Sequence, residues 1–412
     1  MPNSLLEYEE IVGKINITIL KQLAKDLKGA RIVHVNSTKI GGGVAEILEW
    51  LIALMNELGL DASWEIITGP PAFYNTTKTF HNGLQGKPVS LSKSMIKVYE
   101  ETNAETAEKL RDKLQEADFV FIHDPQPALL LEHFPERKGK WIWRCHIDAS
   151  RPYRSVWKYL SEKVKVYDAS IFSLARFAQK LPHPQFIIAP SIDPLSEKNC
   201  DISDQEIESV LDKYGIENHI PLLTQISRFD RFKDPIGVIE AFKMLRKNIA
   251  ARLVLAGGGA SDDPEGQVVF EEVMEAVEGE DDINVLQLPG DAHRVINALQ
   301  RASSIVIQKS LQEGFGLTVT EALWKEKPVI GGNVGGIRLQ VHNYHTGFLV
   351  DSPEGAALRI NYLLRHPERI ESMGRKGKRF VRENFLLTRH LREYLTLMAG
   401  LKKGLANYLI TG

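Results

Sequence analysis

Residues 303–337 read SSIVIQKSLQEGFGLTVTEALWKEKPVIGGNVGGI, and this stretch decides the fold class. Two short runs rich in β-branched residues, 303–308 and 327–332, flank a stretch of helix-forming residues. A strand, a helix and a second strand in this order are typical of a parallel βαβ unit. The segment therefore predicts an α/β protein.

The same alternation recurs along both halves of the chain. The predicted strands cover 31–36, 63–68, 118–123, 141–146, 169–173 and 186–189 in the first half, and begin at 221, 252, 283, 303, 327 and 347 in the second. Amphipathic stretches lie between them, such as 44–58 with apolar residues at helical spacing. This repetition predicts two doubly wound, Rossmann-like parallel-sheet domains.

The length of 412 residues also favours more than one folded unit, at roughly 150 residues per domain. Residues 189–199 contain two prolines and no periodicity, which predicts a linker. We therefore expect one domain over 1–195 and a second over 196–385. After Leu349 the pattern is almost entirely helical, and no strand follows the last helix.

Composition excludes several classes of protein. The net charge of −2 is too balanced for nucleic acid to be the expected partner, and Cys145 and Cys200 alone cannot build a disulfide framework or a four-thiolate metal site. Charged residues interrupt the N-terminal apolar run, so neither a signal peptide nor a membrane span is expected, and we predict a cytoplasmic protein. Gly41 and Gly43 are followed by Glu46, so the nicotinamide-binding fingerprint fails.

Two carboxylates mark the candidate site of the second half. Glu313 and Glu321 have seven residues between them, and Gly314 and Gly316 let the backbone approach a ligand closely. Thr318 with Glu321 predicts a capping box at the start of the following helix, whose free amides favour anions. The two carboxylates are expected to bracket a bound nucleotide sugar.

The segments EGFGLTVTEAL and PVIGGNVGGI resemble the signature of the family 4 retaining glycosyltransferases, which have the GT-B fold. SRFDRFKDP resembles that family's R-x(4)-K pair, with Arg228 and Lys233 in register and Arg231 as an offset competitor. The resemblance implies that this pair holds the donor diphosphate and stabilises leaving-group charge, an effect worth about 3 to 4 kcal/mol per donor group.

The resemblance also assigns the remaining donor contacts. Glu313 and the amides of 314–316 are expected to hold the donor hexose, Glu321 the ribose, and the glycine loop after the first strand the phosphates and acceptor. The full implied donor site comprises Gly42, Gly43, Arg228, Lys233, Glu313, Gly314, Phe315, Gly316, Leu317, Thr318 and Glu321.

Candidate acceptor residues follow two strands of the first half. His123 and Asp124 end one strand, and the next ends in Arg144 and His146, with Asp148 just beyond; ligands bind at such strand ends. By position His146 resembles the family's histidine beside the anomeric carbon and the acceptor, which makes the implied catalytic set His146, Glu313, Arg228 and Lys233. No His or Cys spacing indicates zinc. The polar and aromatic stretch 69–86, expected to be a loop, adds the unranked acceptor candidates Tyr74, Asn75 and His81.

Taken together, WRCHIDASRP, HDPQPALL and the motifs above resemble the trehalose synthases of this family, over nearly the whole chain. The resemblance implies reversible transfer of glucose from a nucleoside diphosphate glucose, such as UDP-glucose or ADP-glucose, to free glucose with retention, giving α,α-trehalose; the preferred nucleobase does not follow from the sequence. It further implies a homodimer and a last helix, about 386–412, that crosses back to the first domain. No cofactor is expected to be essential, although the diphosphate admits a divalent cation such as Mg²⁺.

Three alternatives stay open. The first is a trehalose phosphorylase of the same fold, which would use inorganic phosphate and need no ribose partner. The second is a family 4 glucosyltransferase with a different acceptor. The third is a non-catalytic two-domain sugar-binding protein, which would have no reason to carry a diphosphate site.

Overall fold

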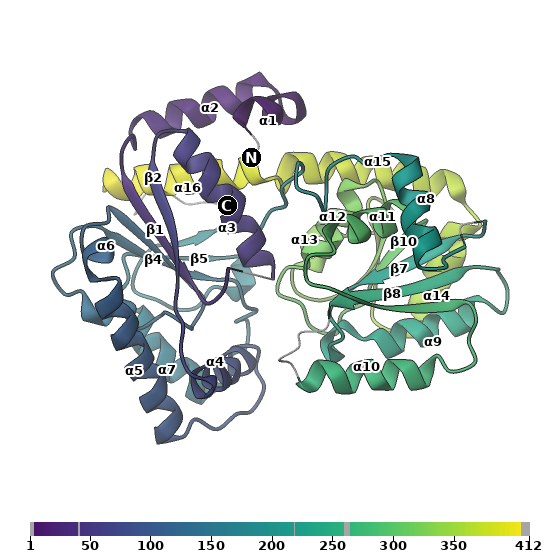
Figure 1. Ribbon diagram of the computed structural model, residues 1–412, viewed down its shortest axis with the longest axis horizontal. Helices are drawn as coiled ribbons and strands as arrows, with labels where there is room; N and C mark the ends of the chain where they lie inside the picture. The colour runs from purple at the N-terminus through teal and green to yellow at the C-terminus, as the bar shows by residue number, and fades with distance from the viewer. Residues whose placement is uncertain (1–3, 40–41, 218, 259–263, 405–412) are drawn as a thin grey trace. The chain divides into compact units, whose positions relative to one another are not determined.

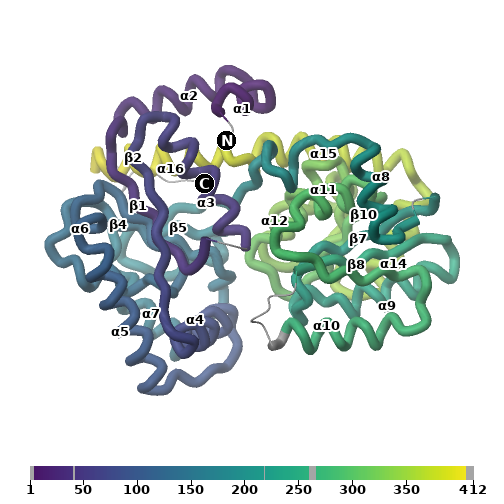
Figure 2. Tube along the Cα trace, in the orientation of Figure 1, coloured from purple at the N-terminus to yellow at the C-terminus, as the bar shows by residue number. Residues whose placement is uncertain are grey.

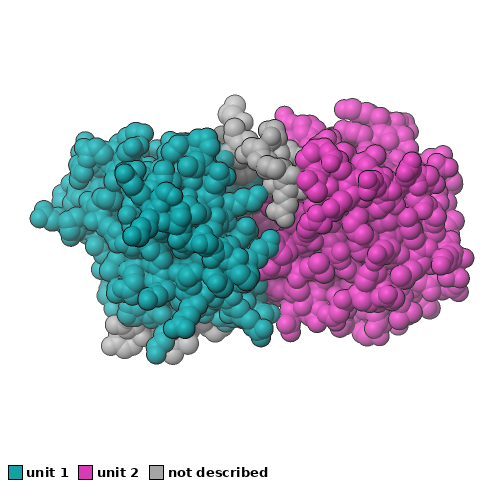
Figure 3. Space-filling model, turned by 90° about the horizontal axis from the view of Figure 1, so that it is seen from below, with its two compact units in different colours: residues 1–190, 387–412 teal, residues 191–386 magenta. Residues whose placement is uncertain are grey.

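The computed structural model describes residues 4–39, 42–217, 219–258 and 264–404, and it divides the chain into two compact units (Figure 3). Unit 1 comprises residues 1–190 and 387–412, and unit 2 comprises residues 191–386. The chain therefore passes from one unit to the other twice, as the trace in Figure 2 shows. The first boundary lies within the predicted linker, but Ser191 and Ile192 are buried in unit 2, where Ile192 forms an isolated bridge with Leu386.

Unit 1 is built on a six-stranded parallel sheet with strand order β2-β1-β3-β4-β5-β6 (Figure 1). Its strands are β1 (Arg31–Asn36), β2 (Asp61–Ile66), β3 (Phe119–His123), β4 (Lys140–Cys145), β5 (Ala169–Phe172) and β6 (Gln185–Ile187). Its helices are α1 (Leu5–Val12), α2 (Lys14–Lys25), α3 (Gly43–Glu57), α4 (Pro71–Leu84), α5 (Lys93–Lys109), α6 (Arg111–Gln115), α7 (Arg154–Val164) and α16 (Leu387–Lys402), with short 3-10 turns at Leu130–His133 and Ala175–Phe177.

Unit 2 has a second six-stranded parallel sheet, with strand order β12-β11-β10-β7-β8-β9. Its strands are β7 (Leu222–Ile226), β8 (Arg252–Gly258), β9 (Ile283–Leu288), β10 (Ile305–Gln308), β11 (Val329–Gly332) and β12 (Gly347–Val350). Its helices are α8 (Asp204–Lys213), α9 (Pro235–Leu245), α10 (Pro264–Ala276), α11 (His293–Ala302), α12 (Leu317–Trp324), α13 (Ile337–Gln340), α14 (Pro353–Leu364) and α15 (Pro367–Asn384), with a 3-10 turn at Arg231–Lys233. The predicted α/β class is confirmed, and each predicted strand is present within a few residues of its expected bounds.

Both faces of each sheet are covered by helices, which explains the uninterrupted apolar strands. In β8, Leu253 and Leu255 pack with α9, α10 and α14, whereas Val254 and Ala256 pack with α8 and α11. Successive side chains of a strand point to opposite faces, so a strand buried on both sides contains apolar residues at every position. In unit 1, α16 takes part in this covering and packs against α2 and α3.

Each sheet has one point where the strand order reverses. In unit 1 this switch point lies between β1 and β3, and in unit 2 between β7 and β10, because the chain builds outward in opposite directions from these pairs. Loops that leave the carboxyl ends of two such strands diverge and leave a crevice, where ligands of doubly wound folds bind. In unit 2 the candidates Arg228 and Lys233 follow β7 and Glu313 follows β10, whereas the candidates of unit 1 lie at the ends of β1, β3 and the adjacent β4.

The predicted loop over 69–86 is wrong, because most of it forms helix α4. Pro71 occupies the first turn, where its missing N–H costs nothing, and Phe73, Phe80 and Leu84 recur at helical spacing on the buried face. Aromatic and polar residues in the sequence obscured that periodicity. Tyr74 and Asn75 lie on the exposed side of this helix, and His81 is half-buried.

Candidate active site

At the switch point of unit 2, Lys233 and Glu313 form an ion pair with Nζ 2.5 Å from Oε2. Lys233 follows β7 and Glu313 follows β10, so the sheet order brings together two side chains 80 residues apart in the chain. Both are largely buried, and Ser310 Oγ adds a longer contact of 3.4 Å to the same carboxylate oxygen. Next to them, buried Lys309 is paired with Asp234, the residue that caps α9. Two pairs of a lysine and a carboxylate, Lys233–Glu313 and Lys309–Asp234, therefore lie in the segments that follow β7 and β10.

The glycine turn after Glu313 has little room for side chains. Gly316 has φ of +85° and caps α12, and a Cβ on Gly335 would lie 1.6 Å from the carbonyl oxygen of Glu313. The amide of Gly336 donates to the carbonyl of Gly314 at 3.1 Å, and Gln340 Nε2 donates to the carbonyl of Phe315 at 2.8 Å. The loop after β11 thus supports the turn, and the close backbone packing explains the glycines of PVIGGNVGGI.

The predicted capping box at Thr318 is wrong. Helix α12 begins at Leu317 with Gly316 as its cap, so Thr318 already lies inside the first turn, and no side chain caps the helix. Glycine in a left-handed conformation replaces the usual hydroxyl cap, which leaves the first amides of α12 without a side-chain acceptor from the cap residue.

Arg228 and Arg231, the two candidate cations near Lys233, differ in their partners. Arg228 is 63% exposed in its side chain and lies 3.8 Å from Asp230. Arg231, the offset competitor, is held by Glu272 through two short bonds of 2.9 and 2.6 Å. Arg228 is therefore the cation whose charge is least neutralised by the protein.

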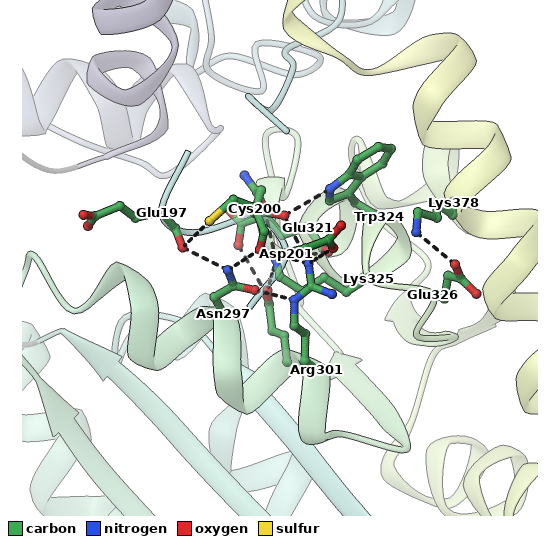
Figure 4. Close-up of polar contacts among 12 residues, drawn as sticks. Glu197, Cys200, Asp201, Asn297, Arg301, Glu321, Trp324, Lys325, Glu326 and Lys378 are labelled. Atoms are coloured by element: carbon green, nitrogen blue, oxygen red, sulfur yellow. Dashed lines mark hydrogen bonds and ion pairs between the residues drawn. The ribbon is translucent and has the colours of Figure 1, made fainter. Parts of the chain in front are cut away.

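Glu321 lies one turn inside α12 and is buried within a polar network (Figure 4). Gln300 Nε2 lies 3.4 Å from Oε2, and Lys198 Nζ lies 3.7 Å from Oε1. Hydrogen bonds from α11 hold residues 197–201 beside this carboxylate. Asn297 donates to the carbonyls of Glu197 and Cys200. Arg301 binds the carboxylate of Asp201 at 2.8 Å. The carboxylate is thus positioned by the segment that opens unit 2 as well as by its own helix.

Lys325, the residue at the C-terminal cap of α12, completes this network. Its Nζ donates to Asn199 Oδ1 at 3.0 Å and to Gln300 Oε1 at 2.8 Å. Burial lowers the pKa of Lys325 to about 7, while the nearby Glu321 carboxylate acts in the opposite direction.

In unit 1, the glycine loop after β1 leads into α3 as predicted. Gly42 has φ of +84° and caps α3, whose first residue is Gly43, and a Cβ on Gly42 would meet no atom of the described residues within 4 Å. Gly41 lies outside the described residues. The open surface at Gly42 and the first amides of α3 suit an anion.

The polar residues that follow β3 and β4 are tied to each other. Asp124 adopts the left-handed conformation with φ of 63°, and its carboxylate accepts the backbone N–H of His146 at 2.7 Å. Burial raises the pKa of Asp124 to about 7, and the His146 amide and Arg144 oppose this rise. Arg144 is fully buried and donates to the carbonyl of Ile188 at 2.7 Å, and Asp148 accepts the amide of Ser150 at 2.9 Å. Asp124 and His146 are partly exposed, whereas Arg144 and Asp148 are buried.

Three histidine rings from neighbouring strands form a chain. His34 Nδ1 lies 3.0 Å from His123 Nε2, and His123 Nδ1 lies 3.0 Å from His146 Nε2. Burial lowers the pKa of all three, that of His34 to about 3. Sequence reasoning singled out His123 and His146 but missed His34. The available signal was that RIVHVN, FVFIH and WIWRCH each carry a histidine near the carboxyl end of a predicted strand.

Over 4–39, 42–217, 219–258 and 264–404, no three His, Cys, Asp or Glu side chains are grouped so as to hold a metal ion. None of the helices in those ranges is long and apolar enough to cross a membrane.

Comparison with known proteins finds a family match for each unit. Residues 34–179 match the model described as "Trehalose synthase, N-terminal domain", and residues 206–380 match "Glycosyl transferases group 1". The chain is 44% identical over 402 residues to the trehalose synthase of Pyrococcus horikoshii, covering 96% of each chain. This protein belongs to the trehalose synthase family. As a member of that family and of the group 1 glycosyltransferases, it is a glycosyltransferase.

The comparison also finds more distant matches, to a trehalose phosphorylase and to the solved structure of a trehalose 6-phosphate synthase. The trehalose phosphorylase of Pleurotus pulmonarius is 27% identical, over 86% of this chain and 55% of its own length. Among solved structures, the α,α-trehalose 6-phosphate synthase of Burkholderia multivorans matches with a TM-score of 0.74 at 14% identity, over 92% of this chain and 100% of its own. This chain thus has the predicted GT-B fold.

Proposed function

We propose that this protein transfers glucose from a nucleoside diphosphate glucose to free glucose with retention of configuration, forming α,α-trehalose reversibly. The observation that carries the proposal is the Lys233–Glu313 pair at the switch point of unit 2, in a chain 44% identical to a trehalose synthase. A cation beside a carboxylate suits a ligand with a phosphate next to a sugar, since the cation binds the first and the carboxylate accepts from the hydroxyls of the second.

In this proposal unit 2, predicted to be the nucleotide-sugar domain, binds the donor. Lys233 and the exposed Arg228 bind the diphosphate, and Glu313 with the amides of Gly314 to Gly316 holds the hexose. Glu321 accepts from the ribose hydroxyls. Lys233 then changes partner from Glu313 to a phosphate oxygen, which leaves the carboxylate available for the sugar.

Unit 1 supplies the acceptor side. His146 lies at the reaction centre, and Gly42 and Gly43 contact the phosphates and the acceptor. The side-chain carboxylate of Asp124 supports His146 by accepting its backbone N–H, and the buried Arg144 donates to the carbonyl of Ile188 within the same unit.

The chemical step requires no enzyme nucleophile. The bond between the anomeric carbon and the β-phosphate oxygen breaks, and the acceptor oxygen bonds to that carbon on the same face. The departing phosphate oxygen takes the proton of the acceptor hydroxyl. The cations stabilise the charge that develops on the diphosphate, which lowers the barrier because the stabilisation is greatest in the transition state.

The test supplies the protein with UDP-glucose or ADP-glucose and glucose, then identifies the disaccharide and its anomeric configuration by NMR and measures released nucleoside diphosphate. The proposal expects α,α-trehalose as the product, with one nucleoside diphosphate released for each trehalose formed. A different disaccharide would indicate another acceptor. Trehalose cleavage that depends on inorganic phosphate, without turnover of either nucleotide, would indicate the phosphorylase reaction instead.

A further inference from the structure

The histidine chain of unit 1 links the buried core to the partly exposed ring of His146. His34 on β1 has no exposed surface, and its ring stacks on Phe121 at 4.7 Å and lies 6.1 Å from Tyr394. His123 on β3 lies between the other two rings, bonded to one through each nitrogen. This arrangement uses both nitrogens of His123 and one nitrogen each of His34 and His146.

All three rings are held in the neutral form. Burial is the largest cause of their lowered pKa values, and Arg144 adds to it at His123 and His146, as do the neighbouring histidines, His390 among them. A neutral imidazole has one N–H donor and one bare nitrogen acceptor. The nitrogen that carries the proton in one ring therefore determines which nitrogen carries it in the next ring.

Only two arrangements give both bonds of the chain. In the first, each ring carries its proton on Nδ1: His34 donates to His123, His123 donates to His146, and the Nδ1–H of His146 is directed away from the chain. In the second, each ring carries its proton on Nε2 and every bond reverses. His146 then presents a bare Nδ1, and His34 has an N–H on Nε2.

The inner end of the chain distinguishes the two arrangements. His34 Nε2 is buried and has no hydrogen-bond partner among the described residues. In the second arrangement that atom would be a buried N–H donor without an acceptor, a condition that native structures avoid more strictly than an unused lone pair. The first arrangement is therefore favoured.

We propose that His34 and His123 are positioning residues that hold His146 in the Nδ1–H tautomer. His146 then presents a hydrogen-bond donor to a substrate oxygen and cannot act as a general base through that nitrogen. The role toward substrate rests on the proposed function, whereas the tautomer is a property of the protein alone. It fits a step in which the departing phosphate, and not the protein, receives the acceptor proton.

The test measures ¹⁵N chemical shifts of the imidazole nitrogens in the full chain labelled with ¹⁵N-histidine, at pH 7.5 without ligand. Protonated and bare nitrogens of a neutral ring have well-separated shifts, and a His146→Asn sample assigns the His146 signals. The proposal expects Nδ1 protonated and Nε2 bare at His146. The opposite tautomer, or a mixture of both, in the wild-type protein overturns it.

His34→Phe tests whether the inner ring sets the tautomer. Phenylalanine keeps a flat ring beside Phe121 and Tyr394 but donates nothing, so His123 becomes free to bond in either direction, and His146 should show both tautomers. Phe121→Leu is the matched control, since it removes packing against His34 and leaves the hydrogen bonds in place; one tautomer should persist. A single unchanged tautomer in His34→Phe would refute the role of His34.

The two proposals fail separately. A wild-type protein that forms no trehalose overturns the proposed function and leaves the tautomer result valid. If His34→Phe does not fold, the wild-type spectrum still decides the direction of the chain. Equal populations of two tautomers would halve the competent form, so kcat for transfer should fall about twofold in His34→Phe and stay unchanged in the control.

Discussion

Replacing Lys325 by methionine should remove a specific pH dependence of stability. Lys325 is 5% exposed and its amine donates to Asn199 and Gln300, and its pKa falls from 10.5 to about 7 because of burial. Between those two values the unfolded chain keeps the proton that the folded protein has released. Stability must therefore rise with pH across this window, since the unfolded state binds more protons.

The magnitude follows from the same pKa values. One proton contributes a slope of about 1.4 kcal/mol per pH unit. The slope is halved near pH 7, where the folded lysine is half protonated, so the gain between pH 7 and 9 is about 2 kcal/mol. In Lys325→Met this contribution vanishes. The free energy of unfolding of the wild type, minus that of the variant, should therefore rise by about 2 kcal/mol between pH 7 and 9.

Urea unfolding at pH 7, 8 and 9, followed by circular dichroism, measures this difference. Subtracting the variant from the wild type cancels the other titrating groups, provided they keep their environments. Lys378→Met is the control, because the Lys378 side chain is 41% exposed and binds Glu326 on the surface. The difference in the free energy of unfolding between the wild type and this variant should not change with pH. A flat difference for Lys325→Met, or one that falls with pH, would refute the reasoning.

Further predictions concern the donor site. Glu313→Ala should lower glucosyl transfer at least about 100-fold while nucleoside diphosphate binding, measured by calorimetry, is largely kept; lost nucleotide binding with normal turnover of bound donor would contradict the assignment. Arg228→Ala should weaken both donor binding and turnover, the latter about 100-fold, and unchanged kinetics would place the diphosphate elsewhere. Gly316→Ala should lower the free energy of unfolding by about 1 to 2 kcal/mol, because φ of +85° is strained for alanine; an unchanged melting temperature would exclude that strain.

The Lys233–Glu313 pair illustrates how far sequence reasoning reached. Each residue could be predicted as a site residue because it follows an apolar strand and matches the spacing of a family motif. Their contact could not be predicted in this way, because it depends on β7 and β10 being neighbours in the sheet. The same holds for Glu321, whose position one turn inside a helix was predicted, whereas Lys198 and Gln300 come to it from other parts of unit 2.

Local patterns determined the elements of this protein. Runs of β-branched residues and helical periodicity are properties of adjacent residues, so the strands, the α/β class and the site-bearing loops could be read directly. Where local signals conflicted the prediction was wrong, as in α4, whose polar and aromatic residues concealed a buried helical face, and at Gly316, which caps α12 in place of Thr318. Tertiary structure alone decided which strand ends meet and which rings share a proton. His34, His123 and His146 become a chain only because β1, β3 and β4 lie side by side, and hydrogen bonds depend on distances that strand order sets.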